Sequence, residues 1–188
     1  MKKTLFALAL LAALPMAASA NDYSNDGAPL NYTYVEGGYA NIDGDADGAY
    51  VRGSVNFGKS NFYGFGEYAR VELDNSNFDV NLGEVGLGYH HGLSARTDLL
   101  GEVAYSNIDT DFGDIDGYRA SVGLRSELCP HFNALAKVNY RDFDYSDSDV
   151  SLTLGGEYKF NSRWSLVGEA ELGDNNAEQY RMGVRASF

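Results

Sequence analysis

The chain has 188 residues and a formal net charge of -13, from 27 acidic and 14 basic side chains. Such an acid excess argues against a nucleic-acid partner, because it would repel the phosphates. Twenty-two glycines, 14 tyrosines and 10 phenylalanines beside only three prolines favour one domain of many strands joined by turns. The lone Cys129 excludes an internal disulfide.

Residues 1–20 have the pattern of an export signal. Lys2 and Lys3 give a positive start, residues 4–16 are mostly apolar, and Ala18-Ser19-Ala20 is a small-residue cleavage site. The apolar stretch is too short to be a membrane-spanning helix. We therefore expect a cleaved signal peptide over residues 1–20, a short periplasmic segment over 21–31, and a β-barrel over 32–188.

Ten later stretches alternate apolar and polar side chains, the period of a strand with one apolar face. They are residues 32–40, 48–57, 62–72, 80–90, 98–107, 117–127, 132–141, 150–160, 164–172 and 179–188. Short connections at 58–61, 91–97, 128–131 and 161–163 alternate with acidic, mostly longer ones at 41–47, 73–79, 108–116, 142–149 and 173–178. Bacterial outer-membrane barrels have short periplasmic turns, longer external loops and an even number of strands. The sequence thus predicts an all-β, antiparallel, up-and-down transmembrane barrel of ten strands, with eight strands or a secreted β-sandwich as alternatives.

The two faces of these strands differ in composition. One face carries no charge and has aromatic residues near both of its edges, as expected of the girdles at the two membrane interfaces. The expected outer ring is Tyr39, Tyr105, Tyr118, Tyr140 and Tyr180, and the expected inner ring is Phe57, Tyr89, Phe132, Phe160, Trp164 and Phe188. The third strand fits least well, and we place Glu67 inward because a carboxylate facing lipid is costly.

The opposite face carries charges of both signs, which we expect to line the lumen. They are Glu36, Arg52, Glu67, Glu84, Glu102, Arg119, Arg125, Lys137, Arg141, Glu157, Lys159, Glu169, Glu171, Arg181 and Arg185. An unpartnered charge in a narrow barrel would cost several kcal/mol, so these groups must pair or be hydrated. Because small barrels are filled by side chains, we expect a network that fixes the register, with a selective pore as the alternative.

Most of the negative charge lies in the acidic connections. Close carboxylates on flexible loops can gather divalent cations, which also bridge the phosphates of lipopolysaccharide. The expected weak Ca²⁺ or Mg²⁺ sites use Asp43, Asp45, Asp47, Asp109, Asp111, Asp114 and Asp116. The first three are similar to the start of an EF-hand loop, but the twelfth position is Ser54 in place of glutamate. No firm metal site and no cofactor is expected, and plain solvation of the loops is the alternative.

An enzyme is not expected. Hydrolysis at the outer rim would require a nucleophile or carboxylate beside a histidine. The histidines, His90, His91 and His131, all fall at the periplasmic end of the predicted strands, opposite the acidic loops. No catalytic residues are therefore assigned.

Several stretches resemble a known family. They are the leader from Leu8 to Ala20, the segment Tyr32-Thr33-Tyr34-Val35-Glu36-Gly37-Gly38-Tyr39, the acidic stretch 44–48, Gly53-Ser54-Val55, and the loop Asp74-Asn75-Ser76. They are similar to the Ax family of xanthomonad outer-membrane proteins, most closely in the first half of the chain. The resemblance implies an outer-membrane barrel that is also carried in vesicles, with links to diffusible-signal regulation, motility, biofilm and virulence. It supplies no catalytic or ligand residues.

The sequence therefore favours a structural or cell-surface role such as adhesion, with the acidic loops contacting a host or cell-surface partner. The alternative is a narrow, gated pore or transporter for small solutes along the charged lumen. The other expected partners are outer-membrane lipid, lipopolysaccharide, periplasmic chaperones and the barrel-assembly machinery.

The last strand is the expected assembly signal. Tyr180, Met182, Val184 and the terminal Phe188 share one apolar face. Deleting Phe188 should lower the amount of barrel in the outer membrane, because the assembly machinery of this class recognises a C-terminal strand. The measurement is the folded fraction of an outer-membrane preparation, seen as a mobility difference between unboiled and boiled protein. Normal insertion of the truncated chain would contradict the prediction.

Overall fold

The computed structural model describes residues 30–42, 46–73, 79–110, 113–144, 148–173 and 178–188. The expected signal peptide lies outside these residues. Within them the chain forms ten strands, as predicted, which rules out the eight-strand alternative: β1 (Tyr34–Ile42), β2 (Ala46–Asn56), β3 (Phe62–Leu73), β4 (Asp79–Ser94), β5 (Thr97–Thr110), β6 (Gly113–Cys129), β7 (Phe132–Phe143), β8 (Asp149–Lys159), β9 (Trp164–Gly173) and β10 (Glu178–Ser187).

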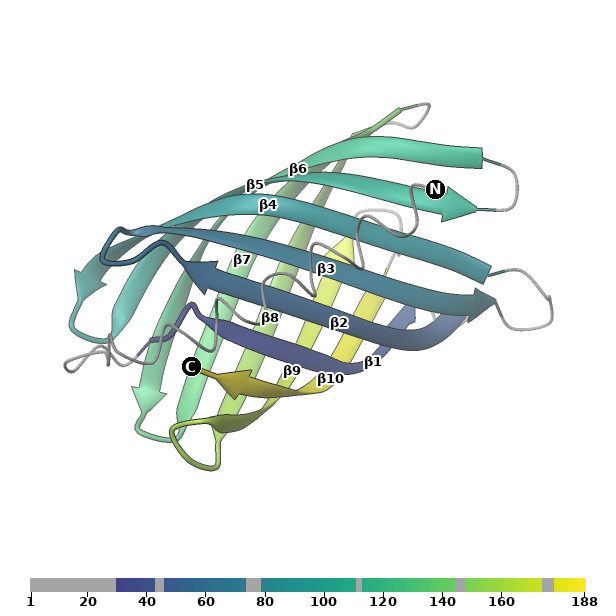
Figure 1. Cartoon of the computed structure of the whole chain (residues 1–188). Coiled ribbons are helices and arrows are strands. Elements are labelled where there is room, and N and C mark those ends of the chain that lie inside the picture. The colour runs from purple at the N-terminus through teal and green to yellow at the C-terminus, as the bar shows by residue number, and fades with distance from the viewer. Residues whose placement is uncertain (1–29, 43–45, 74–78, 111–112, 145–147, 174–177) are drawn as a thin grey trace.

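The strands close into a single antiparallel barrel (Figure 1). Each strand pairs with its neighbours in the chain, and β1 pairs with β10 to complete the ring. This is the predicted up-and-down topology. A closed ring has no sheet edges, which excludes the sandwich alternative and leaves the described ladder without an exposed edge strand.

The barrel has two unlike ends. The turn end, to which both the start of β1 and the end of β10 belong, has the connections 57–61, 95–96, 130–131 and 160–163. The loop end lies at the other side and has the connections after β1, β3, β5, β7 and β9.

The loop-end connections differ from the prediction, because the strands continue into the acidic stretches. Ile108 pairs with Ile115 and Asp109 pairs with Asp114, so the ladder extends beyond the apolar belt. Polar side chains do not prevent ladder hydrogen bonds where water reaches the strand. The prediction that the acidic side chains sit on flexible loops is therefore wrong for Asp47, Asp109, Asp114 and Asp116, which lie on strands. Asp43, Asp45 and Asp111 lie outside the described residues.

The barrel is apolar outside and polar inside. Met182 and Val103 are 63% and 61% exposed on the outer surface, whereas the inward Glu36 and Asn139 are 1% exposed. Most of the predicted girdle residues are exposed as well: Tyr39, Phe57, Tyr89, Tyr118, Phe132, Tyr140, Phe160, Trp164 and Tyr180. An apolar outer surface around a polar interior is the reverse of a water-soluble protein and is typical of a transmembrane barrel. In the described residues no helix is long and apolar enough to cross a membrane.

The first strand begins two residues later than predicted. Tyr32 and Thr33 precede β1, and Leu30 and Tyr32 are buried in a cluster with Tyr63 and Leu100. The end of the expected periplasmic segment thus packs against inward residues of β3 and β5.

Paired glycines form the seam where β1 meets β10. Gly38 lies opposite Gly183, and a Cβ on Gly183 would come within 2.5 Å of the Tyr50 hydroxyl oxygen and 2.8 Å of the Gly37 carbonyl oxygen. The missing side chains leave room for Tyr50, whose hydroxyl donates a 2.7 Å hydrogen bond to Glu36. The glycines thus allow a tyrosine to cover the closing strands.

Replacing Gly183→Val should destabilise the barrel by roughly 1–3 kcal/mol, because the new side chain must displace Tyr50 or the backbone. Urea unfolding followed by heat-modifiable mobility measures the effect. Gly101→Val is the matched control, since an added Cβ there meets no atom within 4 Å. Equal stability of the two variants would show that the seam tolerates side chains.

Candidate functional site

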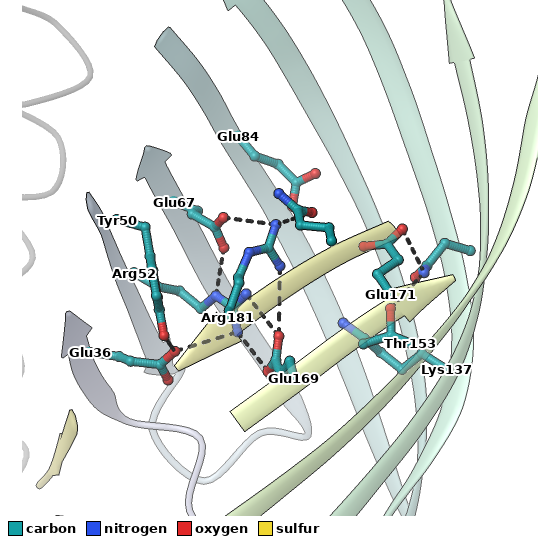
Figure 2. A network of polar contacts seen from close by, with 12 residues as sticks. Glu36, Tyr50, Arg52, Glu67, Glu84, Lys137, Thr153, Glu169, Glu171 and Arg181 are labelled. Atoms are coloured by element: carbon teal, nitrogen blue, oxygen red, sulfur yellow. Dashed lines mark hydrogen bonds and ion pairs between the residues drawn. The ribbon is translucent and has the colours of Figure 1, made fainter. Parts of the chain in front are cut away.

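The lumen is the candidate functional site, because strand alternation directs the predicted charged residues into it. Four of them form the seam cluster around the closing strands: Arg52 on β2, Glu67 on β3, Glu169 on β9 and Arg181 on β10 (Figure 2). The Arg52 Nε lies 2.7 Å from Glu67 and its Nη1 2.8 Å from Glu169. Arg181 approaches the same two carboxylates, at 3.1 Å from Glu67 and 3.7 Å from Glu169. Two cations and two anions thus alternate over the seam.

A second group, the wall cluster, lies on β4 to β7 and consists of Glu84, Glu102, Arg119 and Lys137. Arg119 forms a two-pronged contact with Glu84, the shorter at 2.6 Å, and lies 3.2 Å from Glu102. Lys137 approaches Glu102 to 2.9 Å. Glu102 also accepts a 2.7 Å hydrogen bond from the Tyr63 hydroxyl. The planar guanidinium matches the carboxylate geometry here, which an ammonium group could not do.

A third group, the turn-end cluster, consists of Glu36, Arg125, Glu157 and Arg185. Arg185 lies 2.6 Å from Glu36 and 3.5 Å from Glu157, and Arg125 lies 2.8 Å from Glu157. The remaining predicted lumen residues, Arg141, Lys159 and Glu171, also lie in the lumen. Each forms an ion pair across one intervening strand.

These last contacts are Arg141 with Glu171 and Lys159 with Glu127.

The ion pairs follow the barrel wall. Arg52 on β2 and Glu169 on β9 are separated by β1 and β10, and Arg181 on β10 and Glu67 on β3 by β1 and β2. In the other two clusters, the pairs described above join strands separated by one strand or none. Diametrically opposite strands, such as β1 and β6, are much farther around the ring. The described pairs therefore line the lumen without bridging its diameter.

This arrangement leaves a cavity of about 270 Å³ in the lumen. Its lining extends from Ile42, Asp149 and Gln179 at the loop end to Tyr34 and Tyr63 nearer the turn end. The seam and wall clusters form much of its surface. Paired charges, amides and hydroxyls line the cavity together with Ile42, Phe65, Leu82, Ile108 and Phe143. The polar groups give water or a small solute hydrogen-bonding partners beside apolar surface.

Sequence reasoning missed the uncharged side chains that face the lumen. Asn139 is fully buried and donates to Thr153 at 2.8 Å, and Tyr50 and Tyr63 each bond to a lumen glutamate. Glu127 was missed too. The strand phase could have identified all of them, since each lies an even number of residues from a predicted lumen charge on its own strand.

The predicted cation residues show no metal site in the part of the chain that the structure describes. No three His, Cys, Asp or Glu side chains are grouped there to hold an ion. Asp47 accepts a hydrogen bond from Tyr39, and Asp116 accepts one of 2.7 Å from Asn107. The weak cation sites thus stay a prediction, with Asp43, Asp45 and Asp111 outside the described residues.

The predicted assembly residues Tyr180, Met182 and Val184 lie on the outer face of β10, and Phe188 directly follows that strand. His90 lies at the turn end, 3.6 Å from Asp98, as expected from its position in the chain.

Comparisons with known proteins define the fold. No family model and no curated protein matches the chain. Among solved structures, the KdgM porin matches with a TM-score of 0.53 and 13% identity, covering 82% of this chain and 99% of that chain. The NanC porin matches with 0.53 and 11%, covering 83% and 100%. The translocator domain of the autotransporter NalP from Neisseria meningitidis matches with 0.53 and 10%, covering 100% and 98%. At these identities the likeness establishes a shared barrel fold.

Replacing Glu169→Gln should destabilise the folded barrel by up to about 3 kcal/mol, because Arg52 and Arg181 then share only Glu67 as a counter-charge. Glu72→Gln, an exposed acid on the same barrel, is the control and should change stability little. Urea midpoints of the two variants, refolded in the same lipid, give the comparison. Equal midpoints would show that water replaces the lost partner.

Proposed function

We propose that the protein is an outer-membrane barrel that admits small hydrophilic solutes into a narrow passage through its lumen. The observation that carries this proposal is the cavity of about 270 Å³ that the wall-following ion pairs leave open. A lumen filled by side chains, as the sequence favoured, would leave no such space. Porins of the same fold and similar length support the proposal.

Several features support the outer-membrane location. The outer surface of the barrel is an apolar belt with exposed aromatic residues near its edges, and residues 1–20 have the pattern of an export signal. With both ends of the barrel at the turn end, the usual orientation puts this end in the periplasm and the acidic loop end outside.

The charge of the loop end favours cations over anions. Asp149 lines the cavity near the loop end, and the described cavity lining holds seven carboxylates against five cationic side chains. An excess of carboxylates along a pore raises the local concentration of cations and repels anions. One KdgM structure contains a disordered oligogalacturonate; a polyanion of that kind would be disfavoured at this entrance.

The surface role expected from the sequence is the second candidate. Its supporting observation is the same acidic loop end, where long paired strands present carboxylates away from the apolar belt. Adhesion, biofilm, virulence, vesicle carriage and the resemblance to the Ax family remain predictions. A role without catalysis fits both candidates.

Planar-bilayer recording of the purified full-length barrel tests the passage. We expect brief unitary openings with a reversal potential that favours cations in a KCl gradient. Asp149→Asn, at the loop end of the cavity, should move the reversal potential toward zero, whereas Glu72→Gln should not. Charge changes at Arg119 or Glu102 should alter the openings, because both line the cavity. Absence of openings in every variant would overturn the passage and leave the surface role.

A further inference from the structure

Residues 30–33, which we term the plug segment, cross the mouth of the barrel at the turn end. The segment is anchored on one side beside the seam. The Asn31 side-chain amide donates a 2.9 Å hydrogen bond to the Phe188 carbonyl oxygen, and the Ser54 hydroxyl donates one of 2.7 Å to the Tyr32 carbonyl oxygen. The Thr33 hydroxyl accepts a 3.1 Å bond from the Asn56 backbone N–H.

The same segment reaches the far wall. The Tyr32 hydroxyl donates a 2.8 Å hydrogen bond to Asp98 on β5, and Arg125 on β6 donates one of 2.8 Å to the Asn31 carbonyl oxygen. The Arg125 guanidinium carbon lies 5.2 Å from the centre of the Tyr32 ring. These contacts connect the β1 side to strands opposite it in the ring, whereas the ion pairs of the lumen follow the wall.

The Tyr32 ring is held between aromatic side chains. It stacks on His90 with ring centres 4.3 Å apart and planes inclined by 8°, and on Tyr63 at 5.0 Å. Leu30 and Tyr32 are buried with Tyr63 and Leu100, and Phe65 and Leu135 pack against this group. The plug segment thus makes an apolar, aromatic barrier across the turn end of the lumen.

The barrier lies directly below the cavity. Tyr63 and Phe65 line the cavity and also belong to the group that surrounds Tyr32. A solute entering from the loop end would therefore meet Tyr63 and, beneath it, Tyr32.

Only the last residue of the plug segment continues the barrel ladder, because the Thr33 carbonyl oxygen accepts a 3.0 Å hydrogen bond from the Phe188 backbone N–H. β1 begins at Tyr34 and pairs along its length with β2 and β10, so the ring is complete without residues 30–33. The closed arrangement also leaves Nε2 of His90, whose ring stacks on Tyr32, buried without a hydrogen-bond partner among the described residues. Such a group weakens the closed state, which favours an exchange with an open one.

We propose that residues 30–33 form a gate: in place they close the cavity at the turn end, and their withdrawal opens it to the periplasmic side. The gate rests on the proposed passage for its functional meaning, but the closure itself is a separate property of the lumen and can be measured without any current.

Thiol labelling measures the closure. In a Cys129→Ser background, Leu100→Cys places a thiol at a position that is 3% exposed and lies in the same buried cluster as Tyr32. A small, charged, membrane-impermeant thiol reagent should label it slowly. Adding Tyr32→Ala should raise the labelling rate by more than ten-fold, because about ten-fold corresponds to the loss of one hydrogen bond and this variant also loses the stacking on His90 and Tyr63. Tyr32→Phe, which keeps the ring and loses the bond to Asp98, should give a smaller rise.

Tyr89→Ala is the matched control. It removes an exposed aromatic ring beside His90 but on the outer face, and should leave the labelling rate unchanged. Heat-modifiable mobility confirms that each variant is folded before labelling. If folded Tyr32→Ala and Tyr32→Phe label no faster than the parent, the gate is overturned.

Bilayer recording of the same variants then separates the two proposals. Faster labelling together with more frequent or larger openings in Tyr32→Ala supports both. Faster labelling with no current in any variant supports the closure and overturns the passage. Equal openings in the parent and in Tyr32→Ala, with unchanged labelling, support the passage and overturn the gate.

Discussion

Closure of β1 onto β10 is the constraint on which the rest of the structure depends. Once the ring is complete, half of the side chains of each strand face a confined space, and the other half face outward. A charge in that space is tolerated only beside an opposite charge or water. The alternation of cations and anions over the seam follows from this requirement: Arg52 and Arg181 share Glu67 and Glu169, so that no one of the four is buried alone.

The length of the side chains decides the shape of the lumen. An arginine on one strand reaches a glutamate one to three strands away along the wall, as Arg119 does toward Glu84 and Arg52 toward Glu169. Reaching the opposite wall would take a longer side chain or a second segment of chain. The network can therefore stabilise the ring and still leave a cavity, which explains why a lumen rich in charges need not be a solid core.

Much of this could be predicted from the sequence. The alternation of apolar and polar residues identifies the strands, their outward faces and the inward charges, because it can be recognised within one strand without knowing which strand pairs with it. It does not identify which charges pair, since that depends on the register between strands. It also misplaces strand ends: at Asp109 and Asp114 polarity suggested a loop, but hydrogen bonding continues there. Tyr32 shares the phase of Glu36, and only the structure shows that it leaves the ladder and crosses the mouth.

The ion pairs of the lumen and the contacts of the plug segment therefore have different structural roles. Contacts such as Arg185 with Glu36 join neighbouring strands, and breaking them disturbs the register of the ring. The contacts of Tyr32 with Asp98 and His90 join the ring to a segment outside it. The second set can be lost while every ladder bond persists. A barrel built in this way can change the state of its lumen without unfolding any strand, because the contacts of Tyr32 add nothing to the pairing between strands.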